Sequence, residues 1–146
     1  MPVAMHFADE GFLVECFIER LPTASPWGAV QAATEFYYQR GRTDVVAHAA
    51  DGRVIAIEAK LTDWRTALHQ AFRNLCFAHQ SYVLLPLVTA LRAHQYSAEF
   101  VRRRVGICCL EGAKIVLLCD SIKAEPIEPW LYAEAKSHIG AKGVLF

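Results

Sequence analysis

The chain has 146 residues, of which 54% are hydrophobic, with 15 basic and 15 acidic residues and a formal net charge of zero. This composition excludes intrinsic disorder and fits a single domain over residues 1–146 with its own hydrophobic core. The lack of a basic excess argues against a stand-alone, high-affinity nucleic-acid binder.

Hydrophobic periodicity predicts helices and strands in a mixed order along the chain. The expected elements are a helix over 8–20, strands over 28–38, 43–47 and 54–60, a helix from a Thr62 cap to about 79, a strand over 82–85, a helix over 88–103, a hairpin of 105–110 and 114–118, and a short helix over 130–137. The strand–helix–strand crossover after residue 54 implies a parallel pair of strands. We therefore expect an α/β fold, a three-layer sandwich in which helices cover a mixed central sheet.

The sequence predicts a cytoplasmic protein that does not enter a membrane. No apolar run reaches the roughly 20 residues that a membrane-spanning helix needs. The first residues lack a basic leader and a small-residue cleavage site, so we expect no secretory signal. The five cysteines have no Cys-x-x-Cys spacing, which favours buried, reduced thiols over a metal or redox role.

Three charged residues interrupt the apolar strands in the first half of the chain. Asp44 lies near the start of one strand, and Glu58 and Lys60 close the next. A period of two residues places Glu58 and Lys60 on one face, and strand pairing lets Asp44 point toward that face. Two carboxylates and an ammonium at a strand end form a plausible divalent-metal phosphodiesterase site.

The Glu-x-Lys spacing carries little information by itself. A second copy at Glu134 and Lys136 lies in the predicted C-terminal helix and is typical of a solvated helix surface. Glu58 differs because four apolar residues precede it, and a charge at the end of a buried run needs a partner or a metal. The structural alternative is a lysine–carboxylate pair that closes a sheet edge.

The segments Thr43-Asp44-Val45-Val46 and Ile57-Glu58-Ala59-Lys60, followed by a helix that carries Gln70, resemble the PD-(D/E)XK nuclease superfamily. The similarity is greatest to its small Holliday-junction-resolvase-like and restriction-endonuclease-like members. It spans about residues 8–86, the αβββαβ core of that family, which a C-terminal hairpin and helix would follow here. Thr43 replaces the proline of the family name, and this position is not a metal ligand.

The resemblance implies a Mg²⁺-dependent nuclease, with Mn²⁺ able to substitute, that hydrolyses DNA rather than RNA. Asp44, Glu58 and the Ala59 carbonyl would bind the ion. Lys60 would orient or help deprotonate the attacking water and offset the charge that builds on the phosphate. Gln70 would position Lys60 or the phosphate.

A further acid of the family has two candidates in this sequence. Glu35 precedes Asp44 by nine residues on the first strand and would lie beside it in a sheet. Glu10 lies on the opening helix, on the same face as its apolar stripe. In the family this acid often comes from the opening helix, but the expected position beside Asp44 favours Glu35, and Glu10 stays open as the alternative.

Two other interpretations follow from the composition and the C-terminal tail. One is a catalytically silent relative of the nucleases that binds nucleic acid or a protein partner, which the neutral charge favours. The other concerns assembly: Trp130-Leu131-Tyr132 and Val144-Leu145-Phe146 are candidates for a homodimer contact. The same tail could instead cover the sheet of its own subunit.

Overall fold

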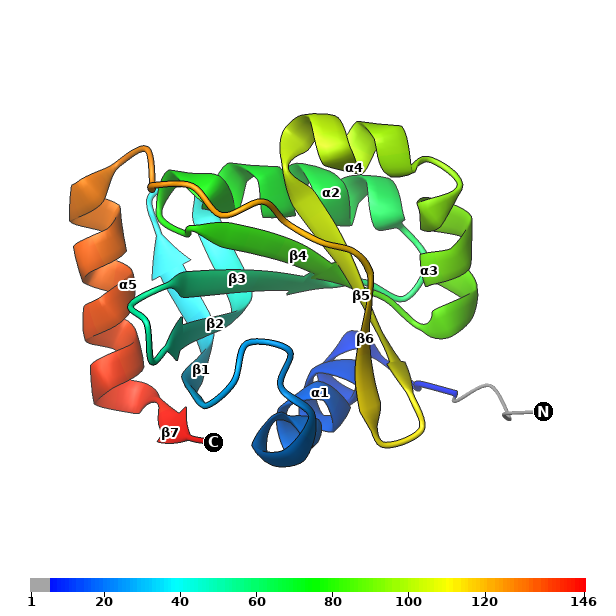
Figure 1. Ribbon diagram of the computed structural model, residues 1–146, viewed down its shortest axis with the longest axis horizontal. Helices are drawn as coiled ribbons and strands as arrows, with labels where there is room; N and C mark the ends of the chain where they lie inside the picture. Colours follow the sequence, from blue (N-terminus) through cyan, green and yellow to red (C-terminus); the bar gives the residue numbers. More distant parts are fainter. Residues whose placement is uncertain (1–5) are drawn as a thin grey trace.

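Residues 6–146 are described by a computed structural model, in which seven strands form one sheet with helices on both faces (Figure 1). The strands are β1 (Val30–Tyr38), β2 (Gly41–Ala49), β3 (Val54–Ala59), β4 (Gln80–Leu84), β5 (Val105–Glu111), β6 (Lys114–Cys119) and β7 (Val144–Leu145). The helices are α1 (Glu10–Ala24), α2 (Trp64–Arg73), the short 3₁₀ helix η1 (Asn74–Cys76), α3 (Leu87–His94), α4 (Ser97–Arg103) and α5 (Pro129–Lys142).

The strand order across the sheet is β6-β5-β4-β3-β2-β1-β7. Strands β3, β4 and β5 run parallel, and the other neighbouring strands pair antiparallel. The predicted α/β sandwich with a mixed sheet is therefore confirmed, as are the order αβββαβ at the start and the hairpin and helix at the end.

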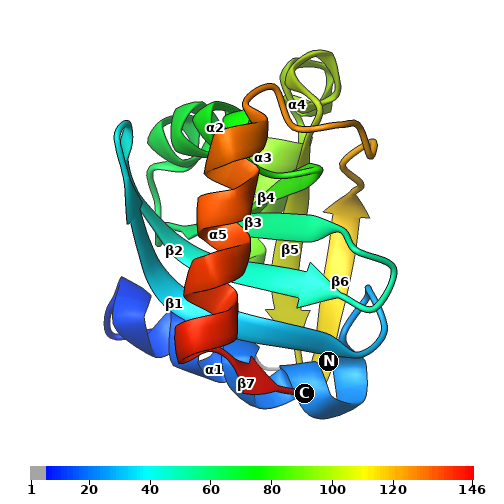
Figure 2. The ribbon, with the colours of Figure 1, turned by 90° about the vertical axis from the view of Figure 1, so that its left-hand side faces the viewer.

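Helix α1 covers one face of the sheet, and α2 to α5 cover the other (Figure 2). Leu13 and Phe17 of α1 are buried in one cluster with Val45 of β2 and Ile57 of β3. On the opposite face, α2, α3 and α4 pack on β4 and β5, and α5 packs on β1 to β3. Strands β3 and β4 are buried along their whole length, as expected for central strands. None of the helices over residues 6–146 has the length and hydropathy to span a membrane.

Three boundaries differ from the sequence expectations. Helix α1 continues through Pro22 to Ala24, because a proline in the last turn removes few hydrogen bonds. Asp63, not Thr62, caps α2, since its side chain accepts a hydrogen bond from the Thr66 amide at 3.1 Å. Helix α2 ends at Arg73, where the 3₁₀ helix η1 tightens the last turn.

The expected helix over 88–103 is two helices with a break at Gln95 and Tyr96. The Tyr96 ring stacks on Trp64 of α2 at a centroid distance of 5.1 Å, and Phe100 of α4 packs on the same indole. The change of direction lets both helices bury apolar residues against β5. This long-range packing outweighs the continuous helical pattern of the segment.

The C-terminal tail packs on its own chain. Leu131, Ala135 and Ile139 of α5 are buried on the sheet, and β7 pairs with β1. Two hydrogen bonds between Val30 and Phe146, at 3.0 and 2.7 Å, extend that pairing. The tail therefore covers the edge of its own sheet, which was the alternative to its predicted role in a homodimer.

The hairpin of β1 and β2 changes its direction at Glu35. Glu35 has a φ of +54°, a left-handed conformation that is uncommon outside glycine. Before this point Ala32 and Val45 face α1, but beyond it Phe36 and Thr43 face the opposite side, toward Phe77 and Asn74. The reversal bends the tip of the hairpin toward the end of α2. It also separates β2 from β3, whose pairing ends at Val45 and Ile57.

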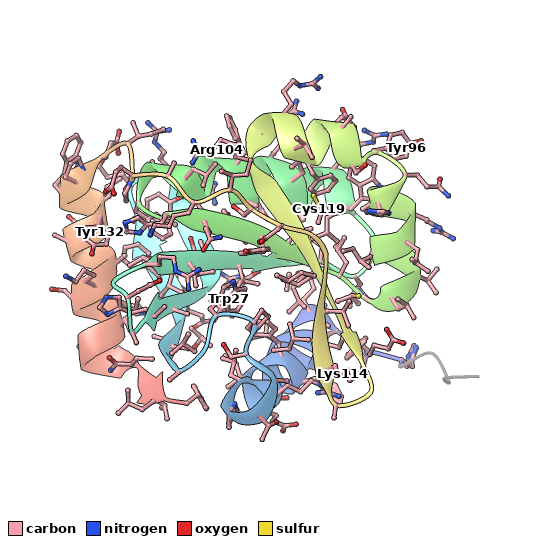
Figure 3. The ribbon with its side chains drawn as sticks, in the orientation of Figure 1. Trp27, Tyr96, Arg104, Lys114, Cys119 and Tyr132 are labelled. Carbon is pink, nitrogen blue, oxygen red and sulfur yellow. The ribbon has the colours of Figure 1, made fainter. Side chains whose placement is uncertain are left out.

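On the face of the sheet that α1 covers, Tyr82 of β4 packs against β5. Its hydroxyl donates to Asp120 at 2.5 Å and accepts from the indole N–H of Trp27, a residue labelled in Figure 3. A Cβ on Gly106 of β5 would lie 2.5 Å from the Tyr82 ring and 2.6 Å from the Cys119 carbonyl oxygen. Only glycine fits between these groups.

We expect Gly106→Ala to lower the free energy of unfolding by about 1–3 kcal/mol, because ring and backbone must move to admit a methyl group. Urea denaturation of the purified protein measures the change. Gly140→Ala is the matched control, since open space surrounds that helical glycine. There alanine should raise the free energy of unfolding by about 0.5–1 kcal/mol. Equal stability of the two variants would contradict this account of the packing at Gly106.

Candidate active site

The candidate site lies where β2 and β3 separate. In a regular antiparallel ladder, the Ala59 amide would donate to a carbonyl of β2. Here it donates to the Oδ2 atom of Asp44 at 2.9 Å, so a carboxylate replaces the backbone acceptor. The other oxygen of Asp44 accepts from the Arg42 guanidinium at 3.0 Å. Asp44 is thereby held at the end of β3, directly beside Glu58.

Glu58 is a buried acid that lies against Asp44. Its side chain is 2% exposed, and its Oε1 atom accepts a hydrogen bond from the Asn74 amide at 2.8 Å. Burial raises the pKa of Glu58 to about 8, and the Asn74 hydrogen bond opposes this shift. The charge of Asp44 and a shared hydrogen bond with it are smaller contributions to the same upward shift. The two predicted metal ligands are thus brought together, and at neutral pH the pair retains a proton.

Asn74 organises a buried polar network behind Glu58. Its Oδ1 atom accepts hydrogen bonds from the hydroxyls of Tyr38 at 2.7 Å and Thr43 at 3.0 Å. The Arg73 guanidinium donates to the Tyr38 hydroxyl at 3.2 Å. Desolvation raises the pKa of Tyr38 to about 12 even though Arg73 opposes the shift. These contacts fix the amide so that its N–H groups face the Glu58 carboxylate.

A cleft of about 620 Å³ opens in front of Asp44. Its walls are the first turn of α1, the kinked part of β1 and β2, and Leu61. Glu35 and Glu10, the two candidates for a further acid, both line it. Arg42 lies 3.6 Å from Glu35 and 3.0 Å from Asp44, so it stands between these acids. The cleft gives a solvent-accessible approach to Asp44, behind which Glu58 is buried.

Lys60 makes a different contact from the one that its strand position suggested. Its Nζ atom lies 3.8 Å from the Oε1 atom of Glu10 on α1. The Glu58 carboxyl instead faces Asn74 at the end of α2. The expected common face of Glu58 and Lys60 is lost because β3 ends at Ala59, after which the two-residue alternation no longer applies. Lys60 therefore lies at the edge of the site, where an ion pair with Glu10 holds it.

Gln70 lies half-buried on α2, one turn before Asn74. Within residues 6–146, the α2–η1 side chain that hydrogen-bonds to Glu58 is Asn74. Sequence reasoning placed Arg42 beside the acidic site but missed Asn74, Tyr38 and Arg73. The available signal was the placement of an amide one turn after Gln70 in an otherwise apolar stretch, since a buried amide must find partners.

The oxygen atoms of the site are of the kind that would hold a hard divalent cation with few protein ligands. Among the described residues, no group of three or more His, Cys, Asp or Glu side chains is arranged to hold a metal. Two carboxylates are nevertheless sufficient for Mg²⁺, which keeps several waters and often binds through one or two carboxylates and a substrate phosphate. Asp44, Glu58 and the Ala59 carbonyl supply oxygen atoms of this kind.

We expect Asn74→Ala to lower the free energy of unfolding by about 2–4 kcal/mol, because three buried partners lose a hydrogen bond. The same change should raise the pKa of Glu58, since the amide stabilises its ionised form. Urea denaturation and NMR titration of the Glu58 carboxyl measure the two effects. Gln70→Ala, one turn earlier on α2, is the control and should leave this pKa unchanged. A Glu58 pKa that is the same in wild type and Asn74→Ala would refute the proposed role of Asn74.

No family model and no curated protein sequence matches this chain. Among solved structures, it is similar to a protein of unknown function from Silicibacter pomeroyi, with a TM-score of 0.62 and 16% identity over 93% of this chain and 84% of that one. A second similar structure is SfsA from Pyrococcus furiosus, solved in complex with Ca²⁺, with a TM-score of 0.39 and 11% identity over 76% of this chain and 61% of that one. The first similarity supports the α/β fold, and the second is too low to support a further conclusion.

Proposed function

We propose that this chain is a Mg²⁺-dependent nuclease of the PD-(D/E)XK type that hydrolyses DNA. The observation that carries the proposal is the contact between Asp44 and the buried Glu58 at the point where β2 and β3 separate. Two carboxylic acids in contact, one of them buried with a pKa near 8, destabilise the folded state. Acids perturbed in this way are concentrated at functional sites. A bound divalent cation would offset that destabilisation.

Asp44, Glu58 and the Ala59 carbonyl would hold the cation. When bound, the ion supplies positive charge against the scissile phosphate and favours deprotonation of the attacking water. Asn74 and the Ala59 amide orient the two carboxylates, so their geometry is set before the substrate arrives. Arg42 lines the cleft, and Lys60 lies against Glu10 of its wall, so both cations would stand near a phosphate that enters there.

A cleavage panel tests this proposal. Labelled single-stranded, duplex, flapped and four-way DNA, with a single-stranded RNA for comparison, are incubated with Mg²⁺, Mn²⁺ or EDTA. The proposal predicts cleavage of at least one DNA substrate with either ion and none in EDTA. Cleavage that persists in EDTA, or no cleavage of any substrate, would argue against it.

We expect Lys60→Ala to abolish cleavage while metal affinity stays the same or rises. The ammonium would offset charge that builds on the phosphate in the transition state, and its removal takes a cation, but no metal ligand, from the edge of the site. Initial cleavage rates and Mn²⁺ calorimetry separate these effects. Glu10→Gln removes the ion-pair partner of Lys60 and keeps the lysine, so its rate shows whether that contact matters. Turnover of Lys60→Ala at the wild-type rate would make Lys60 a structural residue only.

A catalytically silent protein that binds nucleic acid or a protein partner is the second candidate. One observation favours it: Arg42 and the Ala59 amide already occupy both oxygens of Asp44. In that case the arginine would serve in place of a metal as the permanent counter-charge of the acid. Calorimetry with Mg²⁺ and Mn²⁺ separates the two candidates, because the silent protein would bind neither ion at the carboxylate pair.

A further inference from the structure

A second concentration of charge lies beside the candidate site, at the ends of α2 and α4. A pocket of about 280 Å³ is lined by arginines from three elements and by one acid, namely Arg40, Arg73, Arg102, Arg103, Arg104 and Glu125. The chain as a whole has a net charge of zero, so this positive charge is local. Figure 3 shows Arg104 between the end of α4 and the segment that leads to α5.

Most of these arginines form no ion pair within the described residues. In the described part of the chain, Arg40 is the member of the five that forms an ion pair, with Glu128 at 3.4 Å. Neutral acceptors hold three others, the Tyr38 hydroxyl for Arg73, the Glu99 carbonyl for Arg103 and the Ile122 carbonyl for Arg104. Such acceptors fix the guanidinium groups in place without cancelling their charge. Guanidiniums gathered in this way repel one another and favour an anion in the pocket.

The pocket also has an apolar wall that remains exposed to solvent. Phe72 of α2 is 50% exposed and Ile127 is 76% exposed, although both are large hydrophobic residues. A small inorganic anion would not need an aromatic ring beside the arginines. A nucleic-acid strand would, because its phosphates pair with guanidiniums and its unpaired bases stack on aromatic side chains. In a duplex the bases are stacked on one another and cannot reach Phe72.

Arg73 connects this pocket with the carboxylate site. Its guanidinium lines the pocket, donates to the Tyr38 hydroxyl in the network behind Glu58, and donates to the Arg42 carbonyl at 3.4 Å. The side chain of Arg42 in turn contacts Asp44. A strand that lay in the arginine pocket would therefore be next to the tip of the β1–β2 hairpin and the acids that it carries.

We propose that the arginine pocket binds the backbone of a single-stranded DNA segment, with an unpaired base on Phe72. The inference rests on the proposed nuclease function and narrows its substrate class to DNA that has a single-stranded end or branch. Arg102 and Arg103 contact phosphates in this arrangement, and Phe72 distinguishes single strands from duplexes.

Fluorescence anisotropy with a labelled 15-nucleotide oligothymidylate and a labelled 15-base-pair duplex tests the proposal, in EDTA so that no cleavage occurs. The double variant Arg102→Ala/Arg103→Ala should weaken binding of the single strand by at least about tenfold. The slope of the logarithm of its binding constant against the logarithm of the salt concentration should become less steep by about 1.4, the value for two lost phosphate contacts. Phe72→Ala should weaken single-strand binding by roughly tenfold and leave duplex binding unchanged. Arg92→Ala, at an exposed arginine of α3 outside the pocket, is the control for loss of one surface charge.

Thermal melts of each variant establish that the fold is retained, and Arg102→Glu, at an exposed position, repeats the test without loss of packing. Equal single-strand affinities of the double variant and Arg92→Ala would overturn the proposal. Tighter binding of polyglutamate than of the oligonucleotide would also overturn it and would identify an acidic protein partner instead. Because the assay contains no metal, binding without cleavage in the panel would refute only the nuclease function. Cleavage that is unaffected in the double variant would refute only the role of the pocket.

Discussion

Asp44→Asn is expected to reduce the rate of DNA cleavage by at least about a thousandfold. The amide oxygen can still accept the hydrogen bond from the Ala59 amide, so the local fold is retained. The negative charge that would bind the divalent cation is lost, and Arg42 keeps its ion pair with Glu35 at 3.6 Å. Initial rates on the best substrate of the cleavage panel, at saturating Mg²⁺, measure the effect.

Asp51→Asn is the control for this prediction, because it makes the same chemical change at the exposed turn between β2 and β3. That acid pairs with Arg53 and lies at the opposite end of β3. Its variant should cleave at nearly the wild-type rate. A similar rate for Asp44→Asn and wild type would show that any observed cleavage comes from another site or from a contaminant.

Glu58→Gln is expected to make the protein more stable at alkaline pH in the absence of metal. The pKa of Glu58 is raised from 4.5 to about 8 in the folded state, chiefly by burial, so the folded chain holds a proton that the unfolded chain releases. This contribution to stability is fully present below about pH 4.5 and is lost as the pH rises to about 8. The free energy of unfolding that is lost over this pH range amounts to up to about 5 kcal/mol. Glutamine resembles the protonated acid and avoids the loss.

Urea denaturation between pH 5 and pH 9, in EDTA, measures this prediction. Wild type and Glu58→Gln should have similar stability at pH 5, and the variant should exceed wild type by several kcal/mol at pH 9, an order-of-magnitude figure from the same shift. Glu111→Gln, at the exposed turn between β5 and β6, is the control and should follow the wild-type curve. Parallel pH curves for wild type and Glu58→Gln would mean that Glu58 is already ionised in the folded protein at neutral pH.

The sequence was sufficient to predict the central elements of the fold and the two acids of the site. Strand β3, helix α2 and strand β4 have strong local patterns, and the crossover between them fixes a parallel pair. Asp44 and Glu58 meet because the hairpin register follows from the turn between β2 and β3. These features depend on residues that are close in sequence.

The rest of the site depends on conformations and contacts that no local pattern specifies. The left-handed backbone at Glu35 turns the hairpin tip toward α2, and no pattern in this apolar, aromatic strand predicts that conformation. Asn74 reaches Glu58 only because α2 ends at Arg73, six residues earlier than periodicity suggested. The contact of Lys60 with Glu10 depends on where α1 docks, fifty residues away in the sequence. Long-range packing decided each of these positions.

The most direct test of a metal site at Asp44 and Glu58 is calorimetric titration with Mn²⁺ at pH 7, in two buffers that differ in ionisation enthalpy. If the ion binds this pair, Glu58 must lose its proton, because its pKa lies near 8 in the free protein. We therefore predict release of close to one proton per bound ion in the wild type, and neither binding at this site nor proton release in Asp44→Asn. Binding without proton release, or equal binding by wild type and Asp44→Asn, would contradict the assignment of the metal to these two acids.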